Sequence, residues 1–127
     1  MNALLNRVYT PHGSCKLLFH ARDSEVVVSG PAGTGKSRAC LEKLHMMALA
    51  NPGMRGLMVR KTAASLTSSA LVTWTKNVID QSLLVGDVTY YGGSSQESPQ
   101  YKYSNGSVIV LGGMDKSTRV MSSEYDV

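Results

Sequence analysis

Residues 30 to 37 read Gly30-Pro31-Ala32-Gly33-Thr34-Gly35-Lys36-Ser37. They satisfy every position of the phosphate-binding pattern G-x-x-x-x-G-K-[ST]. An apolar run at 25–29 precedes this loop, and a helix-forming stretch at 38–50 follows it. The pattern binds phosphate only between a strand and a helix. The neighbouring segments therefore matter as much as the residue types within the loop. The sequence therefore predicts a buried strand at 25–29, a phosphate-binding loop, and a helix that starts at the end of the loop.

The residue types in the loop fit the chemistry of a phosphate chain. Gly30, Gly33 and Gly35 allow the tight curl in which consecutive backbone N–H groups converge on an anion. The helix N-terminus behind them adds unpaired N–H groups and a favourable dipole. We expect Lys36 to reach the β- and γ-phosphates, and the hydroxyl of Ser37 to bind Mg²⁺. The predicted cofactors are therefore ATP and Mg²⁺, held by all eight residues of the loop.

Size and composition set wide limits. A chain of 127 residues with 43% apolar residues fits one compact domain. The formal net charge of +4 is compatible with a polyanionic partner but does not establish one. Cys15 and Cys40 have neither paired nor metal-ligand spacing, which favours a reduced setting. No apolar run approaches the length of a membrane span, so we expect a soluble protein without a membrane partner.

Two helices and one strand are expected after the loop. In the helix at 38–50, an apolar stripe (Cys40, Leu44, Met47) should face the core, and Arg38, Glu42 and His45 should face outward. The apolar run at 56–60 predicts a strand whose carboxyl end, at Arg60, lies where open α/β sheets bind ligands. Apolar residues recur every four positions in the helix expected at 65–84, with Trp74 as a core anchor.

The remaining segments are shorter. Residues 16–20 are consistent with a short strand, and the turn-rich stretch 92–99 is expected to be a mobile loop. Tyrosines alternating with Lys102, then Asn105-Gly106 and an apolar run at 108–111, predict a β-hairpin. Together with the loop, these elements predict an α/β fold: a P-loop NTPase three-layer sandwich with a mostly parallel central sheet, incomplete at its C-terminus.

Three further segments, taken with the loop, carry a family resemblance. They are Val59-Arg60-Lys61-Thr62 followed by Ser65-Leu66, then Asn105-Gly106-Ser107-Val108-Ile109-Val110-Leu111-Gly112-Gly113, and finally Ser122-Ser123-Glu124-Tyr125-Asp126-Val127. In order and spacing they resemble the N-terminal ATPase domain of phage terminase large subunits, over about residues 9–127. The resemblance implies an ATP-binding part of a motor that couples ATP hydrolysis to translocation of double-stranded DNA into the procapsid. It also implies a homo-oligomeric ring at the portal, a small terminase subunit as partner, and the cytoplasm of an infected bacterium.

The resemblance also implies what this chain lacks. In that family, the segment similar to Glu124–Val127 leads into the Walker B strand, which carries a magnesium-binding acid and a catalytic glutamate. We therefore expect residues 1–127 to be a single truncated ATPase domain, without the nuclease domain of the family. The full-length parent is expected to be an ATPase, and the isolated fragment to be inactive. Glu124 and Asp126 are expected to be polar residues at a strand edge.

Comparison with the family suggests functional roles for several further side chains. Arg60 could couple nucleotide state to the domain, although an ordinary structural arginine is an equal interpretation. Arg119 precedes the expected Walker B strand, where related motors place an arginine finger for the neighbouring subunit. Tyr9 could stack on adenine, with ordinary packing as the alternative. Arg38, just after the loop, is expected to be a surface charge.

Three other functions remain open from the residues alone. A helicase or another DNA-dependent motor would share the loop and a strand ending near Arg60. A small-molecule P-loop kinase would need an arginine-bearing lid, and 92–99 contains no arginine. A nucleotide-binding module that only switches conformation is the third. The host, the packaging strategy, the DNA-contacting residues and the number of subunits in the ring do not follow from the sequence.

Overall fold

The computed structural model of the chain describes residues 9–30, 35–114 and 124–127. Its larger helices are α2 (Ser14–His20), α3 (Lys36–Ala50) and α6 (Asp80–Val85). A further helical stretch is made of α4 (Ala63–Ser65), η1 (Leu66–Ala70), α5 (Leu71–Thr73) and η2 (Trp74–Val78). The strands are β1 (Arg55–Arg60), β2 (Val88–Tyr91), β3 (Gln100–Tyr103) and β4 (Val108–Gly113).

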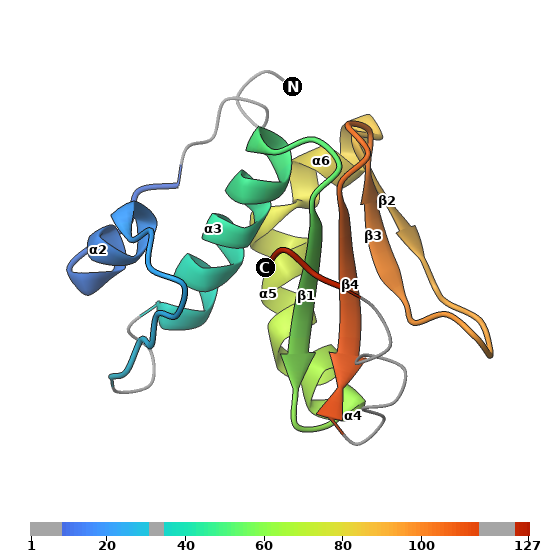
Figure 1. Cartoon of the computed structure of the whole chain (residues 1–127), viewed down its shortest axis with the longest axis horizontal. Helices are drawn as coiled ribbons and strands as arrows, with labels where there is room; N and C mark the ends of the chain where they lie inside the picture. Colours follow the sequence, from blue (N-terminus) through green and yellow to red (C-terminus); the bar gives the residue numbers. More distant parts are fainter. Residues whose placement is uncertain (1–8, 31–34, 115–123) are drawn as a thin grey trace.

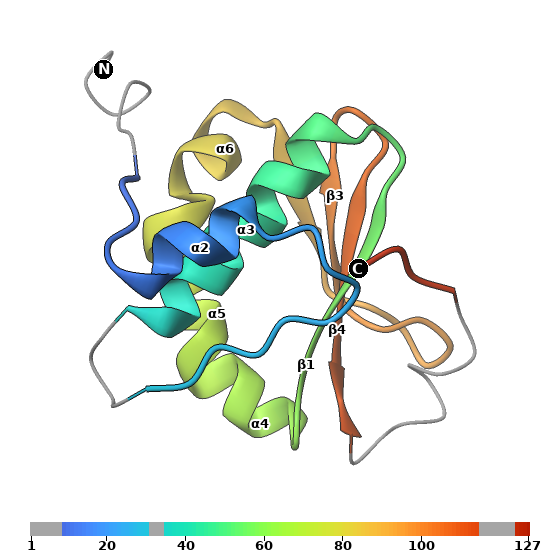
Figure 2. The same cartoon turned by 60° about the vertical axis from the view of Figure 1, so that its left-hand side comes forward.

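The four strands form one mixed sheet in the order β1-β4-β3-β2. β1 and β4 run parallel, whereas β4 with β3 and β3 with β2 run antiparallel. Helices α3 to α6 lie on one face of this sheet (Figures 1 and 2). The predicted three-layer sandwich with a mostly parallel sheet is therefore wrong. The hairpin of β3 and β4 and the return strand β2 make most of the pairing antiparallel, because a short turn can only join antiparallel neighbours.

The strand predicted at 25–29 is also absent from the sheet. Residues 25–30 have no regular secondary structure, and Val27 is 91% exposed. Both edges of β1 are taken by other segments. β4 pairs with one edge, and on the other the backbone N–H of Leu57 donates to the carbonyl of Val127 at 2.8 Å. Residues 25–29 therefore find no free edge of β1 to pair with, although their composition favours a strand.

The C-terminal residues pair with β1 in the manner of a parallel strand. The N–H groups of Asp126 and Val127 approach the carbonyl of Arg55 at 2.7 and 3.4 Å, and Val127 accepts from Leu57 two residues further along β1. One residue flanked in this way by two partners is the parallel ladder pattern. The carboxylate of Asp126 also accepts from the Arg55 N–H at 2.9 Å, which confirms the prediction of a polar strand-edge residue.

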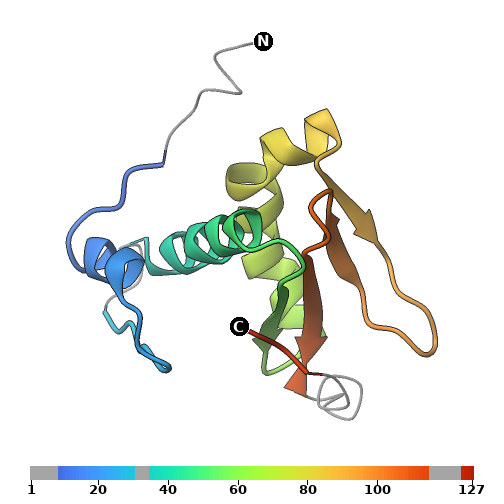
Figure 3. The ribbon, with the colours of Figure 1, turned by 45° about the horizontal axis from the view of Figure 1, so that its top comes forward.

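Residues 16–20, for which a strand was considered, are helical. They belong to α2, where Cys15 and Leu18 are buried and Leu17 is 73% exposed. The buried pair is three positions apart, the spacing that places side chains on one face of a helix. Together with Ala39, which is fully buried on α3, they form a small apolar cluster between the two helices. Figure 3 shows α3 between α2 and the sheet.

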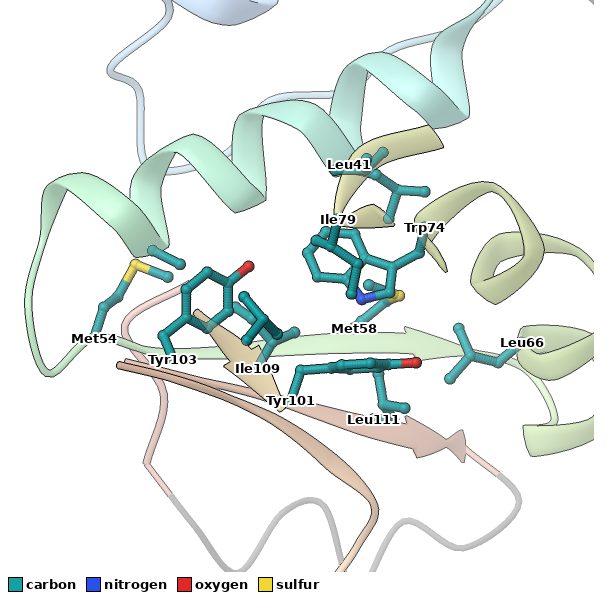
Figure 4. Close-up of a cluster of buried hydrophobic side chains, with 13 residues drawn as sticks. Leu41, Met54, Met58, Leu66, Trp74, Ile79, Tyr101, Tyr103, Ile109 and Leu111 are labelled. Carbon is teal, nitrogen blue, oxygen red and sulfur yellow. The ribbon is translucent and has the colours of Figure 1, made fainter. Parts of the chain in front are cut away.

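The main core lies between α3, the helical stretch and the sheet. Trp74 is fully buried there, which confirms the prediction of a core anchor. Its ring meets Tyr101 of β3 edge-on, with ring centres 5.9 Å apart (Figure 4). Ile109 and Leu111 of β4 point from the sheet toward the same cluster (Figure 4). The core is therefore formed by the predicted hairpin and helices, although the prediction of a mostly parallel sheet was wrong.

The helix expected at 65–84 begins earlier and is interrupted. It starts at Ala63, contains the π-helical segments η1 and η2, breaks at Ile79 and ends at Gly86, which has a φ of +83°. Single π-helical turns lengthen one side of a helix and shift which side chains face the core. No helix in the described parts of the chain is long and apolar enough to cross a membrane.

Candidate phosphate-binding site

The glycine-rich loop meets the pattern's requirement for a following helix, whereas the strand expected before it is absent. Gly35 caps α3 with φ 80° and ψ 15°, in the left-handed region, and the helix starts at Lys36. A Cβ at Gly35 would meet no atom within 4 Å, so the backbone conformation, not crowding, favours glycine here. The carbonyl of Gly35 accepts the first helical hydrogen bond, from Ala39 at 3.0 Å. Four predicted residues, Pro31, Ala32, Gly33 and Thr34, lie outside the described residues.

The two ends of the loop meet through Lys36. Its ammonium donates to the carbonyl of Gly30 at 2.6 Å. This contact brings the first and seventh residues of the pattern together and holds a positive charge beside Gly30 and the start of α3. A cation beside a helix N-terminus is the arrangement that attracts a phosphate group.

Ser37 occupies the second position of α3 and is exposed. Its hydroxyl therefore stands at the helix N-terminus, beside Lys36, where a metal bound to phosphate oxygens would meet it. Mg²⁺ is usually held by one or two protein oxygens, with the rest of its shell made of water and phosphate, so one hydroxyl fits the group. Among the residues that the structure describes, no group of three or more His, Cys, Asp or Glu side chains could hold a metal.

The middle of α3 is fastened to the end of α2 by a side chain that sequence reasoning missed. The ammonium of Lys43 donates to the carbonyls of Leu18 at 2.5 Å and Ala21 at 2.8 Å. Leu18 lies in the last turn of α2 and Ala21 is its C-cap, where the helix dipole favours a cation. Lys43 thus ties the helix after the loop to the segment before it. A lysine at this position of a helix gives no signal in the sequence, because its partners are backbone atoms of another element.

The far end of α3 is held by the turn between β3 and β4. The amide of Asn105 donates to the carbonyls of Ala48 at 2.9 Å and Leu49 at 3.2 Å. The fully buried hydroxyl of Ser107 lies 2.8 Å from the Ala48 carbonyl and 2.9 Å from that of Asn51. The last carbonyls of a helix need such partners when they are buried. The asparagine was recognised in the sequence as a turn residue, but not as a helix-end partner.

Tyr9 packs against neighbouring side chains rather than standing free. Its ring centre lies 5.7 Å from that of Phe19, and the guanidinium of Arg38 lies over its ring at 5.0 Å. Burial, followed by the nearby Cys15 and Glu42, raises the pKa of Tyr9. These are the contacts that the packing interpretation of Tyr9 expects, and its stacking on adenine stays a prediction.

Arg38 is less of a free surface charge than predicted. Besides covering Tyr9, it forms an ion pair with Glu42, with 3.6 Å between Nε and the carboxylate oxygen. Two of the side chains expected to face outward from α3 thus engage each other four residues apart, the favourable spacing on a helix.

The prediction that His45 faces outward is wrong. His45 Nδ1 lies 2.7 Å from the hydroxyl of Tyr103, and its ring meets Trp74 edge-on at 6.0 Å. Burial lowers the pKa of His45 from its usual 6.5. The error has a simple cause: the face of α3 that packs on the sheet and on η2 is centred on Leu41 and Ala48, so His45 lies on it. Cys40, which was expected to face the core, is exposed instead.

The structure describes one of the two candidate arginines, Arg60, and not the other. Arg60, the last residue of β1, donates to the carbonyl of Ser65 at 3.4 Å and to the hydroxyl of Ser69. It therefore braces the strand against the helix that follows. Lys36 and Ser37 are consecutive residues at the start of α3, whereas Arg60 bonds to the helical stretch that follows β1. Arg119 lies outside the described residues.

Comparison with known proteins adds no relative from which a function could be carried over. No protein-family model, no curated protein and no solved structure matches this chain.

Proposed function

We propose that this chain binds Mg·ATP through residues 30–37. The observation that carries the proposal is the junction of the loop with α3, where left-handed Gly35 starts the helix and Lys36 reaches back to Gly30 at 2.6 Å. A helix N-terminus, a lysine ammonium and a neighbouring hydroxyl together supply donors, positive charge and a metal ligand for a phosphate chain. Lys36 would exchange its carbonyl partner for the β- and γ-phosphates, and Ser37 would hold Mg²⁺.

The proposal predicts which nucleotides bind. Because the loop grips the β- and γ-phosphates, ATP and ADP with Mg²⁺ should bind, whereas AMP should bind at least about tenfold more weakly. Equilibrium dialysis of the 127-residue chain with each radiolabelled nucleotide measures this difference. Equal affinities for ATP and AMP would contradict a phosphate-chain site, since they would place recognition on the nucleoside.

We further propose that the site serves a DNA-packaging motor, as the resemblance to terminase large subunits implies. In this role, ATP hydrolysis by the full-length protein moves double-stranded DNA into a procapsid, in the cytoplasm of an infected bacterium. The protein then acts as a ring at the portal with a small terminase subunit. The support is the order and spacing of the segments near Arg60, Asn105 and Glu124, together with the loop. Arg60 remains a candidate coupling residue and Arg119 a candidate finger.

The motor proposal is tested on the full-length protein. Lys36→Ala should abolish ATP-dependent uptake of double-stranded DNA into procapsids. Arg119→Ala should lower ATP hydrolysis in the assembled ring and leave the isolated subunit unchanged, because a finger acts on a neighbour's nucleotide. An ATPase that needs neither DNA nor assembly, with uptake unaffected by Lys36→Ala, would favour one of the non-motor alternatives.

A further inference from the structure

The outer edge of β2 pairs with no other segment in the described part of the chain, because β2 is the last strand of the sheet (Figure 1). The backbone N–H of Ser104 donates to the carbonyl of Asp87 at 2.8 Å, which continues the ladder between β2 and β3 by one pair. Alternate residues of a strand direct their N–H and C=O groups to opposite edges. Since Asp87 bonds to β3, the backbone groups of Val88 and Tyr90 point outward from the sheet.

Apolar side chains border this edge on the face that the helices cover. The ring of Tyr90 lies 4.9 Å from that of Tyr101, between ring centres, yet Tyr90 is 54% exposed. α6 packs beside β2, and its last residues, Leu84 and Val85, are 64% and 48% exposed. The sequence of β2, Val-Thr-Tyr-Tyr, has neither the lysine nor the proline with which proteins often block a free edge. The edge is therefore open to another strand, and that strand would cover apolar side chains.

The opposite face of this edge carries one charge of each sign. Lys102 of β3 pairs with Thr89 of β2, and its ammonium lies over the ring of Tyr91 at 4.7 Å. Asp87 lies at the other end of β2 and is exposed. The lysine thus leans toward the end of β2 that is away from Asp87. A strand that occupies this edge should offer a negative charge beside Tyr91 and a positive charge beside Asp87.

We propose that this strand is β2 of a second copy of the chain, paired antiparallel about a two-fold axis at Thr89. In this register Val88 of each copy lies opposite Tyr90 of the other. These are the residues whose backbone groups point outward, so each such pair exchanges both of its N–H···O bonds. The two threonines face each other across the axis, a favourable cross-strand pair.

Charge complementarity favours this partner in this register. Asp87 of one copy lies opposite Tyr91 of the other, where Lys102 covers the ring. Directly opposite residues have Cβ atoms about 4.5–5.5 Å apart, so the carboxylate meets the ammonium, twice by symmetry. On the helix-covered face, Tyr90 of each copy lies across from Val88 of the other, beside the end of α6. The edge is therefore complementary to itself, as a two-fold interface requires.

This interface is separate from the proposed nucleotide site. Residues 30–37 take no part in it, so the pairing needs no nucleotide and is tested without it. A two-fold pair is closed, whereas a ring needs a head-to-tail interface on other surfaces. Nucleotide binding and pairing through β2 can each fail while the other holds.

Sedimentation equilibrium of the 127-residue chain measures the pairing. A small two-fold interface should give a dissociation constant on the order of 10–100 µM. Asp87→Lys and Lys102→Glu each make both charge pairs across the axis repulsive, and each should weaken dimerisation about fivefold or more. An equimolar mixture of the two variants should dimerise like the wild type, because every charge again meets its opposite. Lys76→Glu, an exposed charge reversal on η2, is the control and should leave dimerisation unchanged.

Tyr90→Pro tests the backbone pairing. It removes an outward N–H group, which β3 does not use, and should abolish the dimer. Circular dichroism checks that this variant folds, and the charge variants, at exposed positions, test the pairing if it does not. A wild-type chain that stays monomeric up to about 1 mM would overturn the proposal. So would a mixture of Asp87→Lys and Lys102→Glu that dimerises no better than either variant alone, or a folded Tyr90→Pro chain that dimerises like the wild type.

Discussion

The Nδ1 atom of His45 lies 2.7 Å from the hydroxyl oxygen of Tyr103, and this contact joins the middle of α3 to strand β3. Both side chains are largely buried, and burial raises the pKa of Tyr103 as it lowers that of His45. Since α3 starts at Lys36, the contact is part of what holds the loop-bearing helix on the sheet.

We expect the free energy of unfolding to fall as the pH drops below about 6.5. His45 has a lowered pKa in the folded chain, so below its ordinary pKa of 6.5 the unfolded chain binds the proton more readily. Above that pH the imidazole is neutral in both states and contributes no pH dependence. Urea unfolding between pH 7.5 and 5 measures the loss. The His45→Gln variant should lose less stability over this range than the His20→Gln variant, and equal losses would contradict the assignment.

We expect Ser107→Ala to lower the free energy of unfolding by about 1–3 kcal/mol, because it leaves buried polar groups without a partner. The Ser107 hydroxyl approaches the Ala48 and Asn51 carbonyls and accepts from the Met54 N–H at 3.3 Å. Urea unfolding at pH 7 is the measurement. Ser68→Ala, at an exposed position, is the control and should change stability little. If Ser107→Ala changed the free energy of unfolding as little as Ser68→Ala does, these contacts would not hold the end of α3.

We expect Trp74→Ala to lower the free energy of unfolding by about 3–5 kcal/mol, the usual cost of emptying a buried aromatic site. Trp74 is fully buried and its ring meets those of Tyr101 and His45. A loss of this size is a large part of the total stability of a small domain. Thermal unfolding followed by circular dichroism should show a strongly lowered midpoint, whereas Leu84→Ala, at a site that is 64% exposed, should not. Similar midpoints in the two variants would mean that the cluster around Trp74 is not the core.

Much of the local structure followed from the sequence. The helix after the loop, the strand ending at Arg60 and the hairpin around Asn105 were predicted because periodicity and turn chemistry act over a few residues. The burial of Trp74 followed from the same periodicity. These signals are short-range and predict the type of each element, although the partners of Trp74 and of β1 lie on distant elements.

The order of the strands in the sheet and the surroundings of α3 could not be predicted from the sequence. Residues 25–29 carry a strand composition, but whether a strand forms depends on an available edge, and the edges of β1 are taken by β4 and Val127. The contacts of Lys43 and Ser107 are with backbone carbonyls of distant elements, which no spacing in the sequence reveals. From the sequence, His45 was expected on the outer face of α3. The sequence does not reveal that two different neighbours bury this helix face.

For the candidate site, the sequence predicted the residue types and the helix junction. The left-handed conformation of Gly35 and the start of α3 at Lys36 agree with that prediction. The contact of Lys36 with Gly30 was not anticipated, because it joins a side chain to a backbone carbonyl six residues earlier, which no sequence pattern reveals. The binding of ATP and Mg²⁺, and the roles of Arg60 and Arg119, stay predictions.

Calorimetric titration of the 127-residue chain with Mg·ATP tests the central proposal most directly. We expect the wild-type chain to bind, and Lys36→Ala to bind at least about tenfold more weakly, because a charge-assisted contact to phosphate is worth about 1.5–3 kcal/mol. Lys76→Ala removes the same charge at an exposed position on η2 and should bind like the wild type. Indistinguishable titrations of the wild-type, Lys36→Ala and Lys76→Ala chains would contradict the assignment of residues 30–37 as a nucleotide site.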